Sequence, residues 1–497
     1  MNEKTSTSTP APTSRKDWFG LAILAVGLGM IVLDGTIVGV ALPSIIQDLH
    51  LNLTDAQWVN SLYSVVFAAL LLAVGRIADA GGRQRVFLVG IVIFAASSLL
   101  AALASGTGTL IAARAIQGIG GAMVLPSSLS TVNAIFRGKD RATAFGIWGA
   151  VMSGAAAIGP LLGGWLTTSY SWRWIFIVNI PISIFVVGFG LFFIRNTRGE
   201  VHNSFDIFGF ATSAVGFGLT IFGLIEGNSL GWWDVKQPLK IGSFTWPWNI
   251  SAAPIALAVG IVSIAVFLLW ETRQTRLDRS ALLNVSLFKF TSFSTGNIAA
   301  AMISIGEFVL VFVIPLFLVS VLHLDALESG WVLAAMAGGA FLAGGMARQL
   351  AVKFSAIKVV ILGLLLEVAG VGLTVVLLEN SPSAQAIAVT LAIYGFGLGL
   401  ASAQLTSTVL GDVPNTLAGS ASATQSTVRQ LGNATGSALA GSILAHSIGV
   451  DFSHTTAQLF TDGTINALIA SLVFLALGLA AAVFLSFRVK AKLSTKN

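Results

Sequence analysis

The sequence contains no cysteine, which excludes disulfide bonds, thiolate metal sites and a cysteine nucleophile. Charged residues are also scarce, at 10% of the 497 residues, whereas soluble domains carry about 25%. No Gly-x-x-x-x-Gly-Lys-Ser/Thr loop occurs to hold a nucleotide phosphate, and the five histidines show no metal-ligand spacing. We therefore expect no metal and no cofactor, and the missing phosphate loop argues against an ATP-driven pump.

Long apolar runs stand where a soluble protein would carry charge. Hydrophobic residues make up 55% of the chain, and the mean hydropathy is +0.87. Runs of about 18–25 residues recur, each long enough to cross about 30 Å of hydrocarbon as a helix. The first run is too long for a signal peptide and has no cleavage site, so we expect it to be retained as a span. The composition predicts an all-α protein embedded in the lipid bilayer.

Fourteen such runs are expected to span the membrane. The expected spans are Phe19–Ala41, Trp58–Val74, Val86–Ala104, Leu110–Val132, Thr143–Leu166, Trp174–Ile194, Phe208–Ile225, Ala252–Trp270, Thr295–Leu318, Ser329–Ala347, Ile357–Leu378, Ala384–Leu405, Ser426–Ala445 and Ile465–Phe487. Six spans, then two, then six suggest two six-helix bundles with two extra transmembrane helices between them.

The expected division of the chain follows from this grouping. It comprises a cytoplasmic N-terminal tail (1–17), a six-helix bundle (18–198), two inserted helices (205–270), a cytoplasmic linker (271–292), a second six-helix bundle (293–488) and a cytoplasmic tail (489–497).

The distribution of basic residues predicts the orientation. On the side of the N-terminus, 22 Lys and Arg residues flank the spans, against three on the other side, namely Arg173, Lys236 and Lys240. Because basic loops stay in the cytoplasm, both termini are expected there. The same rule accounts for the net charge of +6, so no nucleic-acid partner is expected.

A short connection after the second span reads Gly75-Arg-Ile-Ala-Asp-Ala-Gly-Gly-Arg-Gln-Arg85. Its glycines allow a sharp turn, and an ordinary positive cytoplasmic loop would also explain its basic residues. The stretch resembles the motif shared across the major facilitator superfamily. That resemblance implies a cytoplasmic gating motif whose charges hold two halves together, with the residues Gly75, Asp79, Gly82, Arg83 and Arg85.

The first span contains Leu33-Asp-Gly-Thr-Ile-Val-Gly-Val-Ala-Leu-Pro43. This stretch resembles the first-helix signature of the fourteen-span drug:proton antiporters of the EmrB/QacA type, which usually have Asn where this chain has Gly39. Further stretches correspond at Trp58–Tyr63, Arg114–Gly118, Glu271–Arg273 and Arg429–Gly432. The resemblance implies a major facilitator fold and proton-coupled export.

The fifth span carries a glycine and proline pattern. Proline kinks a helix, and glycines let another helix approach closely, so a helix contact is expected on packing grounds alone. The pattern also resembles the antiporter motif that this superfamily has in exporters. Its residues are Gly154, Gly159, Pro160, Gly163 and Gly164.

Ionisable residues inside spans are the strongest indication of function, because each costs about 2.5–3.5 kcal/mol to insert and usually lines a pathway. Asp34 and Glu307 open the two bundles, so repeat symmetry predicts that both face a central cavity. Arg114 resembles the superfamily's proton-coupling arginine, but a structural ion pair within its bundle is the alternative. Glu367 either joins the cavity or pairs with a polar neighbour.

Two other charges are expected outside the site. Arg429 is predicted near an inner helix end and Glu226 near the outer interface, where long side chains reach water.

The sequence thus predicts a proton-coupled multidrug exporter in a bacterial cell membrane, acting as a monomer by alternating access on amphipathic, cationic molecules. Protons and a small-molecule substrate are the expected partners. A dedicated exporter of an endogenous metabolite, antibiotic or lipid is the alternative, and a membrane sensor a remote one. No enzymatic activity is expected.

Overall fold

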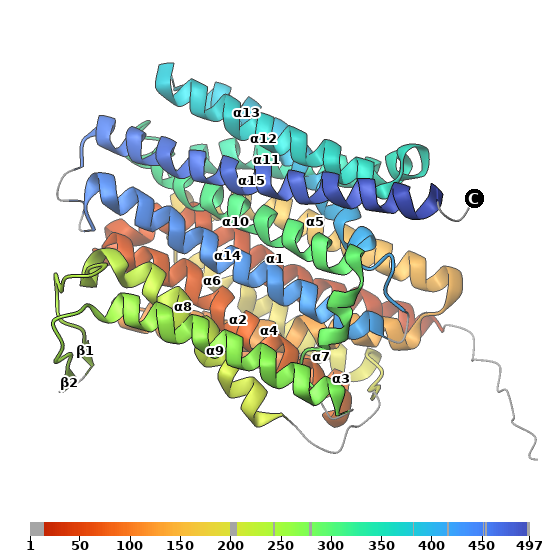
Figure 1. The fold of residues 1–497 in the computed structure, drawn as a ribbon. Coiled ribbons are helices and arrows are strands. Elements are labelled where there is room, and N and C mark those ends of the chain that lie inside the picture. The colour runs from red at the N-terminus through yellow and green to blue at the C-terminus, as the bar shows by residue number, and fades with distance from the viewer. Residues whose placement is uncertain are drawn as a thin grey trace, which may run out of the picture.

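A computed structural model describes residues 14–198, 206–241, 244–277, 281–380, 382–414, 417–450, 452 and 455–494. Its long helices lie side by side in one bundle (Figure 1). The start of α1 and the end of α15 lie at the same end, which we call the terminal end (Figure 1). The short strands β1 (Lys240–Ile241) and β2 (Phe244–Thr245), which pair antiparallel, lie at the other end, which we call the opposite end.

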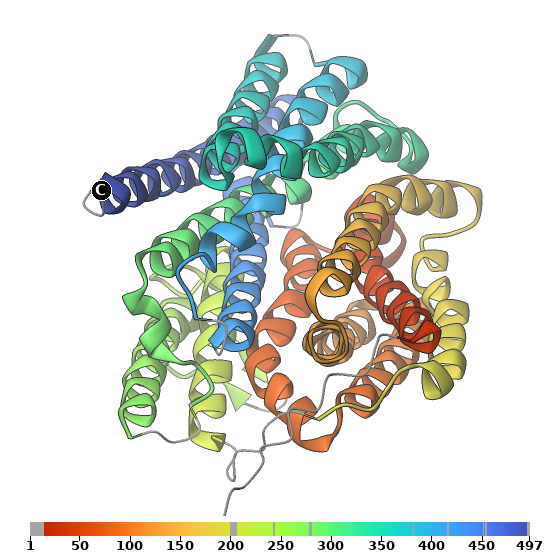
Figure 2. The ribbon, with the colours of Figure 1, turned by 90° about the vertical axis from the view of Figure 1, so that its right-hand side faces the viewer.

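The helices form two halves that contact each other directly, and an inserted pair packs at the edge of the bundle beside α2 and α14 (Figure 2). The first half comprises α1 (Arg15–Leu49), α2 (Leu53–Gly81), α3 (Arg83–Ala102), α4 (Thr107–Ile135), α5 (Gly138–Ser169), α6 (Trp174–Ile177) and α7 (Asn179–Phe193). The inserted pair is α8 (Ile207–Leu230) and α9 (Ala252–Arg276). A 3₁₀ turn, η1 (Val285–Lys289), precedes the second half, which comprises α10 (Thr291–Ser320), α11 (Ala326–Phe354), α12 (Ala356–Asn380), α13 (Ala384–Val409), α14 (Ala418–Ile448) and α15 (Ala457–Ser494).

Within the described ranges, 13 helical segments are long and apolar enough to cross a membrane, with α6 and α7 forming one of them. The fourteenth expected span, Ser426–Ala445, lies in α14, which is absent from those 13. Polar side chains lower its hydropathy, among them Gln425, Thr427 and Arg429. Since α14 packs against α2, α8, α10 and α15, neighbouring helices cover much of its surface.

The helices at the chain ends are longer than the expected spans. A capping box between Ser14 and Asp17 starts α1, inside the segment expected as a tail, and residues 1–13 lie outside the described part. Helix α15 continues to Ser494, while residues 495–497 lie outside. The expected linker 271–292 is ordered where it is described: Glu271 still belongs to α9, and residues 278–280 lie outside.

Glycine pairs bring neighbouring helices together in both halves. A Cβ placed on Gly120 of α4 would lie 2.8 Å from the Gly90 oxygen of α3. In the second half, a Cβ on Gly363 of α12 would lie 2.6 Å from the Gly397 oxygen of α13. Such close approach leaves no room for a larger side chain at these positions. The glycine pairs therefore fix how α3 lies against α4 and how α12 lies against α13, and with that the relative positions of the polar residues on these helices.

The two halves meet along α2 and α14. Gln57 donates to the Ala438 oxygen at 2.7 Å, and Asn60 donates to Ser437 at 2.9 Å. The inserted helix α8 binds both halves at the same seam, because Trp58 of α2 donates to Glu226 at 2.7 Å and Ser442 of α14 donates to the Leu224 oxygen at 2.7 Å.

Candidate functional site

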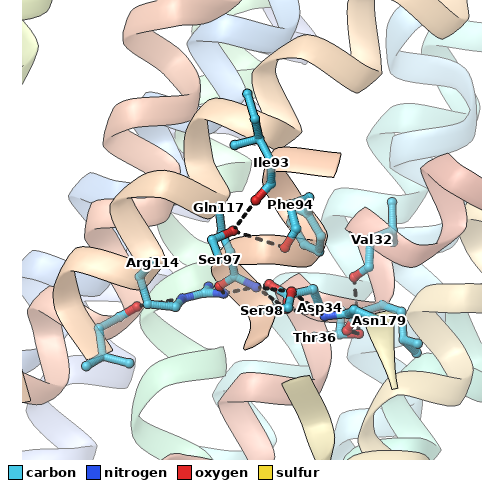
Figure 3. Close-up of polar contacts among 12 residues, drawn as sticks. Val32, Asp34, Thr36, Ile93, Phe94, Ser97, Ser98, Arg114, Gln117 and Asn179 are labelled. Atoms are coloured by element: carbon cyan, nitrogen blue, oxygen red, sulfur yellow. Dashed lines mark hydrogen bonds and ion pairs between the residues drawn. The ribbon is translucent and has the colours of Figure 1, made fainter. Parts of the chain in front are cut away.

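Asp34 of α1 and Arg114 of α4 form an ion pair inside the first half (Figure 3). Arg114 Nη1 donates to Asp34 Oδ2 at 2.6 Å, and the exposed fractions of the two side chains are 1% and 0%. Arg114 also donates to the Val59 oxygen and stacks on the Tyr63 ring at 4.6 Å. The structural alternative for Arg114 is therefore present: it pairs with a carboxylate of its own bundle.

The other oxygen of Asp34 is also occupied. Gln117 and Asn179 donate to Oδ1 at 3.2 Å and 3.1 Å, and both also donate to Ser98 (Figure 3). Asn179 is the first residue of α7 and follows Val178, which separates α6 from α7 but keeps helical dihedral angles. Sequence reasoning did not include Ser98 and Asn179, although each is a polar residue in an apolar segment.

The prediction that Asp34 faces a central cavity is therefore wrong for this conformation. An ionised carboxylate at 0% exposure is stable only when donors surround it, and the interior of the first half supplies three of them. The charge that drew attention to Asp34 is held inside the bundle.

Glu307 of α10 has a different environment. It is partly exposed, and the described residues provide it with no hydrogen bond or ion pair. One turn after Glu307, Val311 lies against Gly39 of α1. A Cβ placed on Gly39 would lie 3.7 Å from Val311 Cγ1. A Cβ on Gly35, one turn earlier in α1, would meet nothing within 4 Å. Since α1 and α10 both run from the terminal end to the opposite end, Glu307 lies at about the level of Gly35, one turn nearer the terminal end than the contact between Gly39 and Val311.

Glu367 of α12 is buried at 0% exposure, and neither carboxylate oxygen has a hydrogen-bond partner within the described residues. The Tyr394 hydroxyl on α13 is equally buried and equally unpartnered there. The two groups interact electrostatically, and Glu307 interacts with both of them. Glu307 and Glu367 thus lie within electrostatic range of each other in the second half, whereas Asp34 and Arg114 lie in the first.

Arg429 is a residue that sequence reasoning placed wrongly. It lies well inside α14 rather than at a helix end, and it is only partly exposed. Its charge acts on Glu307 and on Glu367. The signal for this role was available, since Arg429 is a rare intramembrane cation in the half of the chain that contains both glutamates.

The glycines of the fifth span make two different contacts. A Cβ on Gly163 would lie 2.7 Å from Ile37 Cγ1, and one on Gly159 would overlap Thr36, so both pack on α1. A Cβ on Gly164 would lie 3.0 Å from the Leu327 Cα of α11 in the second half. Pro160 joins that contact through Gly330 of α11, whereas a Cβ on Gly154 would meet nothing within 4 Å. This segment thus joins α1 to the interface between the halves.

In the loop motif, Asp79 and Arg83 make their contacts within the first half, whereas Arg76 donates to the Ala281 oxygen of the linker. Arg83 Nε donates to Asp79 at 2.8 Å, its Nη1 donates to the Ser130 oxygen at 3.2 Å, and Arg85 is exposed. The described residues show no contact from Asp79, Arg83 or Arg85 to the second half, so the expected latch across the halves is not made in this conformation. Gly82 has a φ of 104° and turns the chain from α2 into α3, and a Cβ on Gly75 would lie 3.9 Å from Pro126.

A cavity of about 430 Å³ lies between the halves at the opposite end. Its walls include Gln47 of α1, Thr168 of α5 and Asp325 just before α11. None of the predicted site residues lines it. In the part of the chain that the structure describes, no group of three or more His, Asp or Glu residues could hold a metal ion.

Comparison with known proteins adds the family. The sequence profile of the Major Facilitator Superfamily matches residues 24–207 and 202–437. The multidrug efflux pump LfrA of Mycolicibacterium smegmatis is 32% identical over 89% of this chain and 83% of its own length. The tetracenomycin C resistance and export protein of Streptomyces glaucescens is 28% identical over 90% and 80%. The riboflavin transporter RibZ of Clostridioides difficile is 28% identical over 93% and 96%.

Among solved structures, the chain is similar to a bacterial homologue of the human lysosomal transporter Spinster, in an inward-facing and occupied conformation. The TM-score is 0.61 at 17% identity, and the match covers 96% of this chain and 98% of that one. At this identity the likeness concerns the fold alone.

Proposed function

Because the chain belongs to the major facilitator superfamily, we propose that this multi-pass membrane transporter is a proton-coupled exporter of amphipathic, cationic small molecules. It works by alternating access as a monomer in the bacterial cytoplasmic membrane, with both termini in the cytoplasm. The fourteen-span arrangement of the EmrB/QacA type is part of the proposal, with α14 as the additional span.

The observation that carries the proposal is the pair of membrane carboxylates without hydrogen-bond partners, Glu307 and Glu367, in the described residues of the second half. An ionisable group in a span costs about 2.5–3.5 kcal/mol to insert, and such groups mark ion and substrate paths. Each carboxylate can bind either a proton or a cation, because both neutralise the same negative charge. Competition between proton and substrate couples their opposite movements.

Export rather than uptake is supported by the fifth-span segment and by the relatives. Gly159 and Gly163 pack on α1 while Gly164 packs on α11, so the segment that resembles the exporters' antiporter motif links α1 with the second half. LfrA is named a multidrug efflux pump, and the Streptomyces relative is named for resistance to and export of tetracenomycin C.

The ion pair in the first half suits a half that moves as one body. Asp34 and Arg114 tie α1 to α4, and Asn179 adds α7. The contact between Gly39 and Val311 lies beyond Glu307 toward the opposite end, and the open space beside Gly35 lies on the side of the terminal end. With the terminal end in the cytoplasm, substrate enters from the cytoplasm and reaches Glu307.

The test is proton release from acidified inside-out proteoliposomes as compounds are added. A panel of lipophilic cations such as tetraphenylphosphonium, neutral drugs and anions is compared, with protein-free liposomes as the control. Several cations are expected to release protons. Cation uptake that is unaffected when nigericin collapses the pH gradient would contradict proton coupling.

A dedicated exporter of one metabolite is the second candidate, because RibZ, which the chain matches over 93% of its residues, is named a riboflavin transporter. In that case riboflavin or one other neutral or anionic compound would release protons, and the cations would not.

A further inference from the structure

The two glutamates of the second half differ in access. Glu307 is partly exposed, at about the level of Gly35. Glu367 is completely buried, and its backbone nitrogen lies 2.7 Å from a Cβ placed on Gly397, so α13 closes tightly over it. Glu307 is thus the more accessible of the two carboxylates, while Glu367 is enclosed within the second half.

Tyr394 is enclosed together with Glu367. A Cβ on Gly370 of α12 would lie 2.7 Å from the Tyr394 Cβ, and Gly370 is one helical turn from Glu367. In the described residues, neither the phenol nor the carboxyl group has a hydrogen-bond partner, and the two groups are not hydrogen-bonded to each other in this conformation. Buried polar atoms without partners are rare in folded proteins. A phenol donor beside a carboxyl group can stabilise the carboxylate whenever that group loses its proton.

Arg429 lies within electrostatic reach of both glutamates. An arginine guanidinium is a permanent cation, and that of Arg429 forms no ion pair or hydrogen bond within the described part of the chain. Next to it, Gly432 places α14 against α10, since a Cβ there would lie 2.7 Å from Ser304 Cβ, one turn before Glu307. Arg429 is thus a cation that either carboxylate can attract.

Building on the proposed function, we propose that Glu367 and Tyr394 form an enclosed proton site that is separate from the substrate-accessible Glu307, and that Arg429 couples the two. A cationic substrate binds the Glu307 carboxylate and repels Arg429, which moves toward Glu367. The O–H bond of Glu367 then breaks, its proton passes to water, and the carboxylate keeps the electron pair and pairs with Arg429. When the cation leaves, Arg429 returns to Glu307, and Glu367 takes up a proton.

Other charged groups near Glu367 are few. Helices α11 and α15 also pack against α12, but their described charged residues lie toward their ends: Glu328, Arg348 and Lys353 on α11, and Asp462 and Arg488 on α15. The response of Glu367 to pH therefore depends on Glu307, Arg429 and Tyr394.

The first experiment measures binding of tetraphenylphosphonium to the full-length protein in lipid nanodiscs, together with the protons released. In the parent protein, we expect about one proton to be released for each tetraphenylphosphonium ion bound. The affinity for this cation should therefore fall up to about tenfold for each pH unit of acidification. Glu367→Gln should still bind the cation, but with no proton release and no pH dependence. Arg429→Gln should bind the cation and release few protons. Glu307→Gln should bind at least about tenfold more weakly.

Matched controls are available at exposed positions. Glu379→Gln lies on the same helix as Glu367, and Arg348→Gln lies on α11; both residues are exposed and should behave like the parent. If Glu367→Gln releases protons as the parent does, or if Glu307→Gln removes proton release while leaving cation affinity unchanged, the separate proton site is wrong.

Tyr394→Phe supplies a second readout that a packing role would not change. Loss of a hydrogen bond to the carboxylate should move the pH midpoint of cation binding upward by about one to two units. Tyr170 is 61% exposed at the opposite end, so Tyr170→Phe should leave the midpoint unchanged. An unchanged midpoint in Tyr394→Phe overturns the assignment of Tyr394.

The outcomes separate this inference from the proposed function. If the parent protein releases no protons with any cation of the panel, the proposed function fails. If the parent couples normally and Glu367→Gln couples equally well, only the separate proton site fails.

Discussion

The two halves of the molecule treat a buried carboxylate in opposite ways. In the first half, Asp34 receives hydrogen bonds from Arg114, Gln117 and Asn179. In the second half, Glu367 is equally buried but has no hydrogen-bond partner in the described residues. The helix packing around the two carboxylates is similar. Gln117 lies three residues before Gly120, the glycine at which α4 touches α3. Tyr394 likewise lies three residues before Gly397, the glycine at which α13 touches α12.

This difference shows that similar helix packing can hold either a carboxylate in a fixed ion pair or a carboxyl group that can gain and lose a proton. A buried ion pair with all its hydrogen bonds holds helices together, and removing one partner costs about 3–5 kcal/mol. A buried carboxylate without partners is stable only while it is neutral, so it responds to protons and to nearby cations. We infer that the first half is the rigid one and that the second half carries the exchange.

The largest expected effect concerns the stability of the first half. Arg114→Leu leaves Asp34 charged and unpaired in the interior, so we expect a loss of about 3–5 kcal/mol in the free energy of unfolding. Glu367→Gln removes a carboxyl group that has no partner and should cost less than about 1 kcal/mol. Thermal unfolding of both variants in the same detergent measures the difference. Equal destabilisation would remove the distinction between the halves.

The next effect concerns the segment that joins the halves. Gly159→Leu should reduce transport at least about tenfold or make the protein leaky, because its side chain would push α5 away from Thr36 on α1. Pro160→Leu should act in the same direction, since it changes the kink beside Gly330. Gly154→Leu is the matched control, because a Cβ there meets nothing within 4 Å. Transport assays in proteoliposomes compare the three, and equal activity of Gly159→Leu and Gly154→Leu would reduce the motif to coincidence.

A third prediction counts the charge moved per cycle. If only the second half exchanges a proton, one proton enters as one monovalent cation leaves, and the membrane potential has no net charge to act on. A dication would leave with one excess charge against an inside-negative potential, which costs about 2.3 kcal/mol per 100 mV and lowers its gradient about 40-fold. Valinomycin and nigericin, which collapse the potential and the pH gradient separately, provide the measurement. Potential-driven export of a monovalent cation would mean that a second carboxylate, such as Asp34, also carries a proton.

The smallest expected effect on stability is at the loop motif. Asp79 and Arg83 form a partly exposed pair, with side-chain exposures of 36% and 13%, so Asp79→Asn should change stability by less than about 1 kcal/mol. Transport should nevertheless fall if the loop contacts the second half in another conformation of the cycle. The purified variant is compared with the parent for both properties. Normal transport would show that the loop motif has no role in gating.

Much of the architecture could be predicted from the sequence. Exposing unpaired backbone N–H and C=O groups to lipid is costly, so a long apolar segment in a membrane forms a helix with few alternatives. Twelve of the fourteen expected spans lie within single helices of the structure, whereas Val86–Ala104 runs past the end of α3 and Trp174–Ile194 covers α6 and α7 and runs past the end of α7. Helix α14 is more polar than the rest, and other helices surround it. The intramembrane charges were also identified from the sequence. Their partners were not, since Asn179 and Arg429 are distant in sequence from the groups they face.

By itself, the sequence determined that this protein is a bundle of membrane helices with a few costly charges inside, because apolar length and charge are properties of local segments. Only the tertiary structure decided which charges are paired. Helix periodicity says which side chains share a face, but donors for Asp34 come from α4 and α7, and the neighbours of Glu367 come from α10, α13 and α14. Whether a buried carboxylate is a fixed support or an exchange site depends on those neighbours, and distant segments meet only in the folded chain.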